Sequence, residues 1–238
     1  MMETETNRKA TPQANRYRPL HSTATFLQLL FGLFIVAAVV VVITGWAYRA
    51  TLLDVVAGRS GSLADTLQRE ENYIAASGLL AGVNVVLVAA FVSWFWRAYS
   101  NLRALGRTTR RKPGWAIFSW VIPIGNFFIP YQMGSEIWRK SAPNDPESGV
   151  SADQNIEPVI SWWALFLLMG LVNQIAFFSG RDVGDNAERL AAVVGVDLVG
   201  GLVAIAAAVA AFRFVRLATA RQEAPTDMAG SPIAGPIR

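Results

Sequence analysis

The stretch FLQLLFGLFIVAAVVVVITGWA, residues 26–47, decides the fold of this chain. As an α-helix it rises by about 33 Å, enough to cross a hydrocarbon core of about 30 Å. Its β-branched residues 39–43 would suit a strand in water. In lipid the backbone must satisfy its own hydrogen bonds, so a spanning helix is favoured. The run is longer than the apolar core of a signal peptide and no clean cleavage site follows it, so we expect an uncleaved span.

Three further apolar runs, residues 74–96, 159–178 and 190–215, predict three more spanning helices. Hydrophobic residues make up 53% of the 238-residue chain and charged residues 16%, whereas an average soluble domain has about 25% charged residues. The sequence therefore predicts an all-α integral membrane helical bundle with four transmembrane helices.

Residues 115–131, WAIFSWVIPIGNFFIPY, form a shorter apolar run with a different composition. The run is interrupted by Pro123, Gly125, Asn126 and Pro130, which are poorly suited to the interior of a helix. A straight spanning helix would not have this composition. We therefore expect a broken segment that is re-entrant or interfacial.

Polar sequence flanks the membrane domain, which we place at residues 26–217. Residues 1–25 contain mixed charges and two prolines, and residues 218–238 end in a stretch rich in Pro and Gly. Neither segment has an apolar face to bury. We expect both to be disordered tails.

Two longer loops connect the predicted elements. Residues 48–73 read as a hydrophilic loop, in which Ser62 followed by Asp65 is typical of a helix start. Residues 132–158 are polar and acidic, with a turn-rich stretch at residues 141–149 that we expect to be mobile.

The basic residues distinguish two topologies. If the broken segment returns to the side from which it enters, 16 of the 21 Lys and Arg residues lie on the side of both termini. If it crosses, the division is 12 against 9. Because cytoplasmic loops carry an excess of Lys and Arg, the first topology is favoured. We expect a multi-pass protein of the bacterial cytoplasmic membrane with both termini in the cytoplasm.

The composition excludes several chemistries. The chain has no cysteine, and its one histidine, His21, lies in the predicted N-terminal tail. The sequence therefore lacks the residues needed for disulfides, for zinc and iron–sulfur sites, for a bis-histidine haem and for Ser–His hydrolysis in the membrane. We expect no metal, no cofactor and no identifiable catalytic residue. The net charge of +4 is explained by arginine-rich cytoplasmic loops, so we expect no nucleic-acid partner.

Three motifs lie close together in the chain: WFWRAYSNLRALG at residues 94–106, VIPIGNFFIPYQ at 121–132 and EIWRKS at 136–141. Together they resemble the bacterial membrane family catalogued as domain of unknown function 4328. That family is similar in combining an aromatic-W-x-R-A-x-x-N-x-R-x-L-G signature, a P-x-x-N-x-x-x-P-Y segment and an I/L-W-x-x-S ending among about four membrane helices. The resemblance implies a fold rather than an activity. The candidate motif residues are Trp96, Arg97, Asn101, Arg103, Gly106, Pro123, Asn126, Pro130, Tyr131 and Trp138.

Arg97 and Asn101 are four residues apart and share one face of a helix. In one interpretation, Arg97 is a snorkelling arginine that needs no ligand. In the other, the two side chains hold the broken segment in place, because its backbone carbonyls at residues 123–126 need donors.

A third interpretation of this region is an anionic-lipid site. Basic clusters beside a membrane span attract lipid headgroups by general electrostatics. The candidate headgroup residues are Arg103, Arg107, Arg110, Arg111 and Lys112.

The break within residues 115–131 also has two interpretations. Broken helices line binding sites in transporters. A hairpin that shapes the cytoplasmic face is the alternative, which we favour because the sequence shows no second broken segment that would complete a repeat.

Asp197 is a carboxylate inside a predicted span, and Asn84 and Asn173 lie at a similar predicted depth. A polar layer of these three residues would either respond to protons or cations or form interhelical hydrogen bonds. The small residues of the last span, such as Gly200 and Gly201, predict a tightly packed central helix or a self-association surface.

The leading functional hypothesis is a non-enzymatic membrane scaffold or regulatory partner. Its Arg-rich cytoplasmic face would engage anionic lipids or another membrane protein, because the motifs gather on that face. One alternative is a small transporter or channel that uses Asp197 and the broken segment. A second alternative is a lipid-modifying membrane enzyme.

Overall fold

The computed structural model describes residues 17–59, 62–141, 155–181, 184 and 186–230. Within these ranges the chain is helical and has no strand. Four helices are long and apolar enough to cross a membrane: α1 His21–Val56, α2 Leu63–Ala104, α5 Glu157–Ser179 and α6 Ala187–Gly230. The prediction of an all-α bundle with four membrane spans is therefore confirmed.

The helices extend beyond the predicted spans into the charged sequence on either side. Residues 48–56 and 63–73, which we expected to form a hydrophilic loop, belong to α1 and α2. The predicted helix start is present, since the Ser62 hydroxyl accepts a hydrogen bond from the Asp65 N–H at 3.5 Å. Charged residues are compatible with a helix once it leaves the hydrocarbon, so apolar length alone underestimates helix length.

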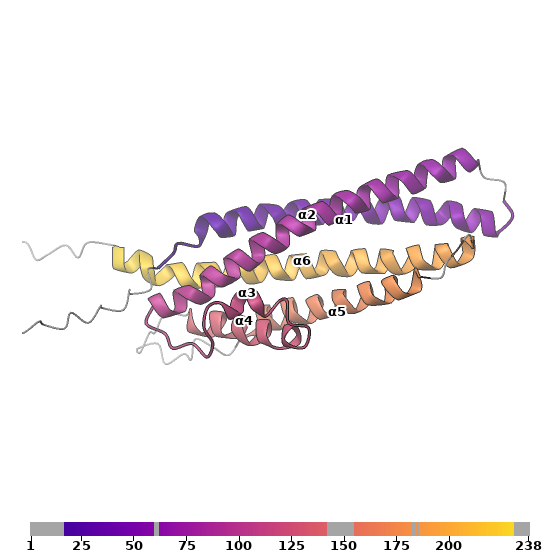
Figure 1. Cartoon of the computed structure of the whole chain (residues 1–238). Helices are drawn as coiled ribbons and strands as arrows, with labels where there is room; N and C mark the ends of the chain where they lie inside the picture. The colour runs from indigo at the N-terminus through magenta and orange to yellow at the C-terminus, as the bar shows by residue number, and fades with distance from the viewer. Residues whose placement is uncertain (1–16, 60–61, 142–154, 182–183, 185, 231–238) are drawn as a thin grey trace, which may run out of the picture.

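The four long helices form a row in which α1 and α6 are central (Figure 1). α2 packs on α1, and α5 packs on α6. Among the described residues, α2 and α5 share no interface of comparable extent. The bundle therefore has a groove between its two outer helices.

Small residues allow α6 to lie close to its neighbours, as the sequence indicated. A Cβ atom at Gly201 would lie 2.7 Å from Cγ2 of Val42 on α1. At Gly200 the nearest atom is Cγ1 of Val172 on α5, at 3.4 Å. Gly78 and Gly82 of α2 have no such neighbour within 4 Å. Gly200 and Gly201 of α6 therefore lie at contacts with other helices of the chain, and Gly78 and Gly82 of α2 do not.

The broken segment consists of short pieces: α3 Trp115–Phe118, the 3₁₀ turn η1 Gly125–Phe127 and then α4 Ile129–Lys140. Its turn hydrogen bonds are local, for example from the Asn126 N–H to the Ile122 carbonyl at 2.7 Å. α4 continues to residue 140, so the predicted polar loop at residues 132–158 begins later than we expected. Its turn-rich stretch, apart from Ser141, lies outside the described residues.

Trp120, in the turn after α3, packs between the two outer helices. Its ring centroid lies 5.8 Å from that of Phe95 on α2 and 5.7 Å from that of Phe166 on α5, both in edge-on geometry. Such pairs contribute about 0.5–1.5 kcal/mol each beyond area burial. Trp162 links this cluster to α6, since its ring stacks on Phe214 at 4.8 Å. The broken segment is therefore a wedge between α2 and α5.

Replacing Gly201 by alanine is expected to destabilise the contact between α1 and α6, because the new methyl group would overlap Val42. Overpacking of this kind costs about 1–3 kcal/mol. The measurement is the free energy of unfolding in a detergent–SDS titration. Gly82→Ala is the matched control, since it makes the same change on a spanning helix with open space around it. Equal stability of the two variants would contradict the observed helix packing.

Candidate functional site

Asn101 fastens the start of the chain to the end of α2. Its Oδ1 accepts a hydrogen bond from the Arg18 N–H at 2.9 Å, and its Nδ2 donates to the Arg18 carbonyl at 2.8 Å. The side chain is 1% exposed. A buried amide that satisfies both backbone groups of one residue fixes that residue as a strand partner would. Arg18 is therefore held in place by Asn101.

Gln222 of α6 extends this network across the end of the bundle. Its Oε1 accepts from Asn101 Nδ2 at 3.1 Å, and its Nε2 donates to the Ala98 carbonyl at 2.9 Å and to the Ser141 hydroxyl at 3.0 Å. Gln222 is fully buried. One side chain thus connects α6 to α2 and to the residue that follows α4. We call Asn101, Gln222 and Ser141 the amide clasp.

Both predicted tails take part in this end of the structure. The backbone N–H groups of Leu20 and His21 donate to Glu223 Oε1 at 3.0 and 2.6 Å, respectively. Leu20 is fully buried. The expectation of disordered tails from 1 to 25 and from 218 to 238 is wrong for residues 17–25 and for the helical residues from 218 onward. Residues 1–16 and 231–238 lie outside the described residues.

Arg97 also contacts the start of the chain. Its Nη1 donates to the Thr23 hydroxyl at 3.0 Å. On the same side of α2, the Arg18 guanidinium lies 4.6 Å from the Trp96 ring centroid, a cation–π distance. Trp96, Arg97 and Asn101 therefore fasten residues 18–23. The interpretation that Arg97 and Asn101 hold the broken segment is wrong, because the hydrogen bonds of the two side chains go to Arg18, Thr23 and Gln222.

Gly106 ends α2 in a left-handed conformation with φ of +75°. Two hydrogen bonds close the turn, from the Gly106 N–H to the Arg103 carbonyl at 3.1 Å and from the Arg107 N–H to the Leu102 carbonyl at 2.8 Å. This pattern is a Schellman motif, in which glycine avoids the Cβ strain of positive φ. Gly106 therefore directs the basic loop back toward α4.

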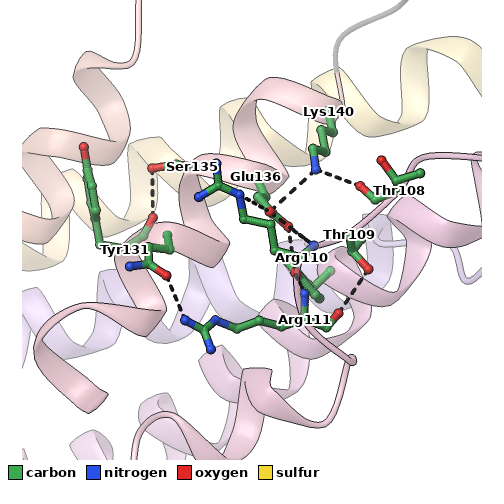
Figure 2. A network of polar contacts seen from close by, with 10 residues as sticks. Thr108, Thr109, Arg110, Arg111, Tyr131, Ser135, Glu136 and Lys140 are labelled. Carbon is green, nitrogen blue, oxygen red and sulfur yellow. Dashed lines mark hydrogen bonds and ion pairs between the residues drawn. The ribbon is translucent and has the colours of Figure 1, made fainter. Parts of the chain in front are cut away.

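Glu136 of α4 is the acceptor at the centre of that loop (Figure 2). Tyr99 donates its hydroxyl to Glu136 at 2.7 Å, and the Arg110 N–H lies 3.3 Å from both carboxylate oxygens. Ion pairs from the Arg110 Nε at 3.5 Å and the Lys140 Nζ at 3.6 Å complete the set. Glu136 as a whole residue is 8% exposed, and its carboxylate has partners on several sides. A buried charge is stable only when it is paired and hydrogen-bonded in this way.

The five candidate headgroup residues lie on or beside this loop. Arg103 donates to the Thr109 hydroxyl at 3.0 Å and to the Arg111 carbonyl at 3.1 Å. Arg111 donates to Gln132 at 2.9 Å. Arg110 and Lys112 are exposed, and Arg107 is partly buried. The loop is thus an ordered element in which Arg110 pairs with the buried Glu136 while Arg110 and Lys112 stay exposed.

The remaining motif residues position α4. Pro130 lies in the first turn of α4, where a missing N–H costs nothing, and it is buried. The Tyr131 ring lies 6.5 Å from that of Trp163 on α5. Trp138 donates its Nε1 proton to the Asn155 carbonyl at 3.0 Å, and the Arg221 guanidinium lies 3.6 Å from its ring. Pro123 lies in the exposed turn before η1.

Asn84, Asn173 and Asp197 line one cavity of 380 Å³ between the outer helices. Tyr73 of α2 donates its hydroxyl to Asp197 Oδ2 at 2.9 Å. This hydrogen bond joins α2 to α6, which is the structural role that we weighed for the polar layer. Within the described ranges, Asp197 belongs to no group of three or more acidic, His or Cys residues that could hold a metal ion.

Sequence reasoning missed Gln222, Glu223 and the role of Glu136. The continuing helix could have been recognised from Ala218, which extends the buried face of Phe214 by one turn. The pairing of Glu136 with Lys140 at four residues apart was also readable. The contact of Gln222 with Asn101 spans 121 residues, and no local pattern predicts it.

Replacing Asn101 by leucine is expected to release residues 18–23 and to leave Gln222 Oε1 and the Arg18 backbone without these partners. The cost of such unsatisfied buried groups is about 1–3 kcal/mol. Two readouts apply: the free energy of unfolding falls, and chymotrypsin cleaves faster between Tyr17 and Arg18, whose N–H is bonded to Asn101 in the native protein. Asn72→Leu is the matched control, because Asn72 is exposed on the same helix. Unchanged cleavage in Asn101→Leu would contradict the clasp.

The family model described as "Domain of unknown function (DUF4328)" matches residues 59–220. No curated protein and no solved structure matches the chain significantly. The matched region contains the three motifs, the basic loop, the broken segment and the three later spans. The chain therefore belongs to the DUF4328 family of domains of unknown function.

Proposed function

We propose that this protein is a non-enzymatic scaffold of the bacterial cytoplasmic membrane that binds anionic lipid headgroups on its cytoplasmic face. The binding element is residues 103–140, which we call the lipid-facing unit. The observation that carries the proposal is the juxtaposition, in this unit, of exposed apolar side chains and an ordered basic loop.

The apolar half of the unit is the broken segment. Most of its large apolar side chains are exposed, and Val121 and Ile124 reach 76% and 77%. A contiguous exposed apolar surface is unusual in water and typical of a membrane contact. The exposed side chains are Trp115, Ile117, Phe118, Val121, Ile122, Ile124, Phe127 and Phe128.

The basic half of the unit directly precedes the apolar half in the chain. Residues 103–140 contain seven Lys and Arg residues and one acidic residue, Glu136. Because Glu136 is buried among its partners, it orders the loop while leaving a net positive surface. Headgroup phosphates lie just outside the hydrocarbon, so basic groups beside inserted apolar groups are placed to meet them.

The opposite end of the bundle has a different charge. Residues 48–73 and 179–189 together contain five basic and seven acidic residues. By the positive-inside rule, the end that carries residues 103–140 belongs in the cytoplasm. The two described chain ends lie at that same end, since Leu20 and His21 contact Glu223.

Removing basic groups from the unit is expected to weaken phosphatidylglycerol binding. The full chain is reconstituted in nanodiscs of mixed phosphatidylcholine and phosphatidylglycerol, and retained lipids are counted by native mass spectrometry. Arg110→Gln with Lys112→Gln should lower phosphatidylglycerol retention by about fivefold per removed charge. Higher salt should lower retention by the native protein as well.

Arg69→Gln with Arg189→Gln is the matched control, because it removes the same charge from the opposite end. If both double variants retained phosphatidylglycerol like the native protein, lipid binding by the unit would be contradicted. The basic face would then be expected to bind another membrane protein instead. Crosslinking at Lys112 in native membranes would detect that partner.

A further inference from the structure

The cavity of 380 Å³ that contains Asp197 has polar groups from three of the four long helices. Tyr73, Ser77 and Asn84 come from α2, Asn173 from α5 and Asp197 from α6. Small-molecule sites in proteins usually have volumes of about 300–1,000 Å³ and a few polar groups in an otherwise apolar wall. The cavity is therefore large enough for a small molecule, and it has polar groups that could orient one.

Tyr73, Asn173 and Asp197 converge on one part of this cavity. The Tyr73 hydroxyl donates to Asp197 Oδ2 at 2.9 Å. A Cβ atom on Gly200 would lie 3.8 Å from Asn173 Oδ1. Because Gly200 follows Asp197 by three residues, it lies on the same face of α6, about one turn further along. The Asn173 amide oxygen is therefore close to the Asp197 carboxylate.

The second carboxylate oxygen of Asp197 is open to the cavity. Among the described residues, Oδ1 has no hydrogen-bond partner, and it is not one of the buried atoms that lack one. Since Asp197 lines the cavity, an occupant can reach this oxygen. Asn173 is also exposed in the absence of lipid. Two accessible oxygen acceptors, one of them on a carboxylate, therefore face the same space.

The charge of Asp197 has no counter-ion in this part of the bundle. Among the described residues, Asp197 forms no ion pair. Arg49 of α1 packs on the same helix, but its Nε donates to the Ala191 carbonyl at 3.0 Å. Between Arg189 and Arg213, α6 has no other charged residue. A carboxylate inside a membrane span needs a cation or a proton to offset its charge.

The large side chains beside this polar group are apolar, and they favour an organic cation over a hydrated inorganic one. They include Phe34 of α1, Leu80 of α2 and Met169 of α5. Asn84 lies about 16 Å from Tyr73 along α2, so it is remote from the carboxylate. Water around an inorganic ion would lack partners on the apolar wall. A primary ammonium has three N–H donors for the oxygen acceptors, and an apolar body would contact the rest.

We propose that this cavity binds a small primary amine in its ammonium form. The ammonium donates to Asp197 Oδ1 and to Asn173 Oδ1, while Tyr73 keeps its hydrogen bond to Asp197 Oδ2. The apolar body of the amine lies along Phe34 and Met169. The lipid-facing unit contributes no residue to this cavity. The proposal therefore does not depend on the binding of anionic headgroups, and a failure of either proposal leaves the other standing.

The probe is radiolabelled phenethylamine, which is an ammonium ion at neutral pH. Its equilibrium binding to the full chain is measured in nanodiscs of phosphatidylcholine alone, because anionic lipids would attract any cation. Binding to protein-free nanodiscs is subtracted. Phenethyl alcohol has the same apolar body without the charge. The native chain is expected to bind the alcohol about tenfold more weakly than the amine, since hydrogen bonds to charged groups are the stronger ones.

Asp197→Asn should weaken phenethylamine by about tenfold or more and change the alcohol by less than about twofold. The reason is that asparagine still accepts from Tyr73 but has no charge. Asn173→Leu removes the second acceptor and should weaken the amine by about fivefold. Asp65→Asn is the matched control, because it removes the same charge from an exposed position on the same helix as Tyr73. It should leave both affinities unchanged.

Three results would overturn the proposal: no saturable binding of phenethylamine, equal binding of amine and alcohol, or an unchanged amine affinity in Asp197→Asn. Asp197 would then be left with its interhelical hydrogen bond to Tyr73 as its role. If Asp197→Asn fails to fold, as judged by circular dichroism and gel filtration, Asn173→Leu decides instead. An unchanged amine affinity in that variant would contradict the proposed contact.

Discussion

The insertion of Trp120 between α2 and α5 is the contact on which the arrangement of this protein depends. In lipid there is little hydrophobic drive between helices, so association relies on close packing and hydrogen bonds. α1 and α6 obtain such packing from Gly201, whereas the outer helices α2 and α5 meet through aromatic rings, with Phe91 and Phe95 lying 5.6 and 6.1 Å from Trp162 between ring centroids. The ring of Trp120 meets aromatic side chains on both. The broken segment thus joins the two outer helices through one aromatic side chain.

The same segment places the basic loop and the amide clasp at one end of the bundle. α4 follows the wedge directly, and its Glu136 gathers the loop that ends α2. Just beyond α4, Ser141 meets Gln222, which in turn meets Asn101. Hydrogen bonds through α4 and the amide clasp therefore link the broken segment, the basic loop and Arg18.

The sequence predicted the helical class and the four spans, because each depends on local composition and length. It also indicated that residues 115–131 do not form a straight span, since proline and glycine act through the backbone alone. It failed at the helix ends and at the clasp. Asn101 was recognised as a motif residue, but its partner Arg18 is 83 residues away, so its target was assigned to the wrong segment. The Trp120 Nε1 and the Asn126 Oδ1 are buried without a hydrogen-bond partner, which depends on tertiary packing and is invisible in the sequence.

The position of residues 103–140 relative to the bilayer is the central claim, and cysteine labelling tests it most directly. The native chain has no cysteine, so Thr108→Cys and Ala64→Cys each introduce one exposed thiol at opposite ends of the bundle. An impermeant maleimide is applied to intact cells. We predict labelling at residue 64 and none at residue 108 until the membrane is opened. Labelling at residue 108 in intact cells would contradict the account, because the basic loop would then face away from the cytoplasm.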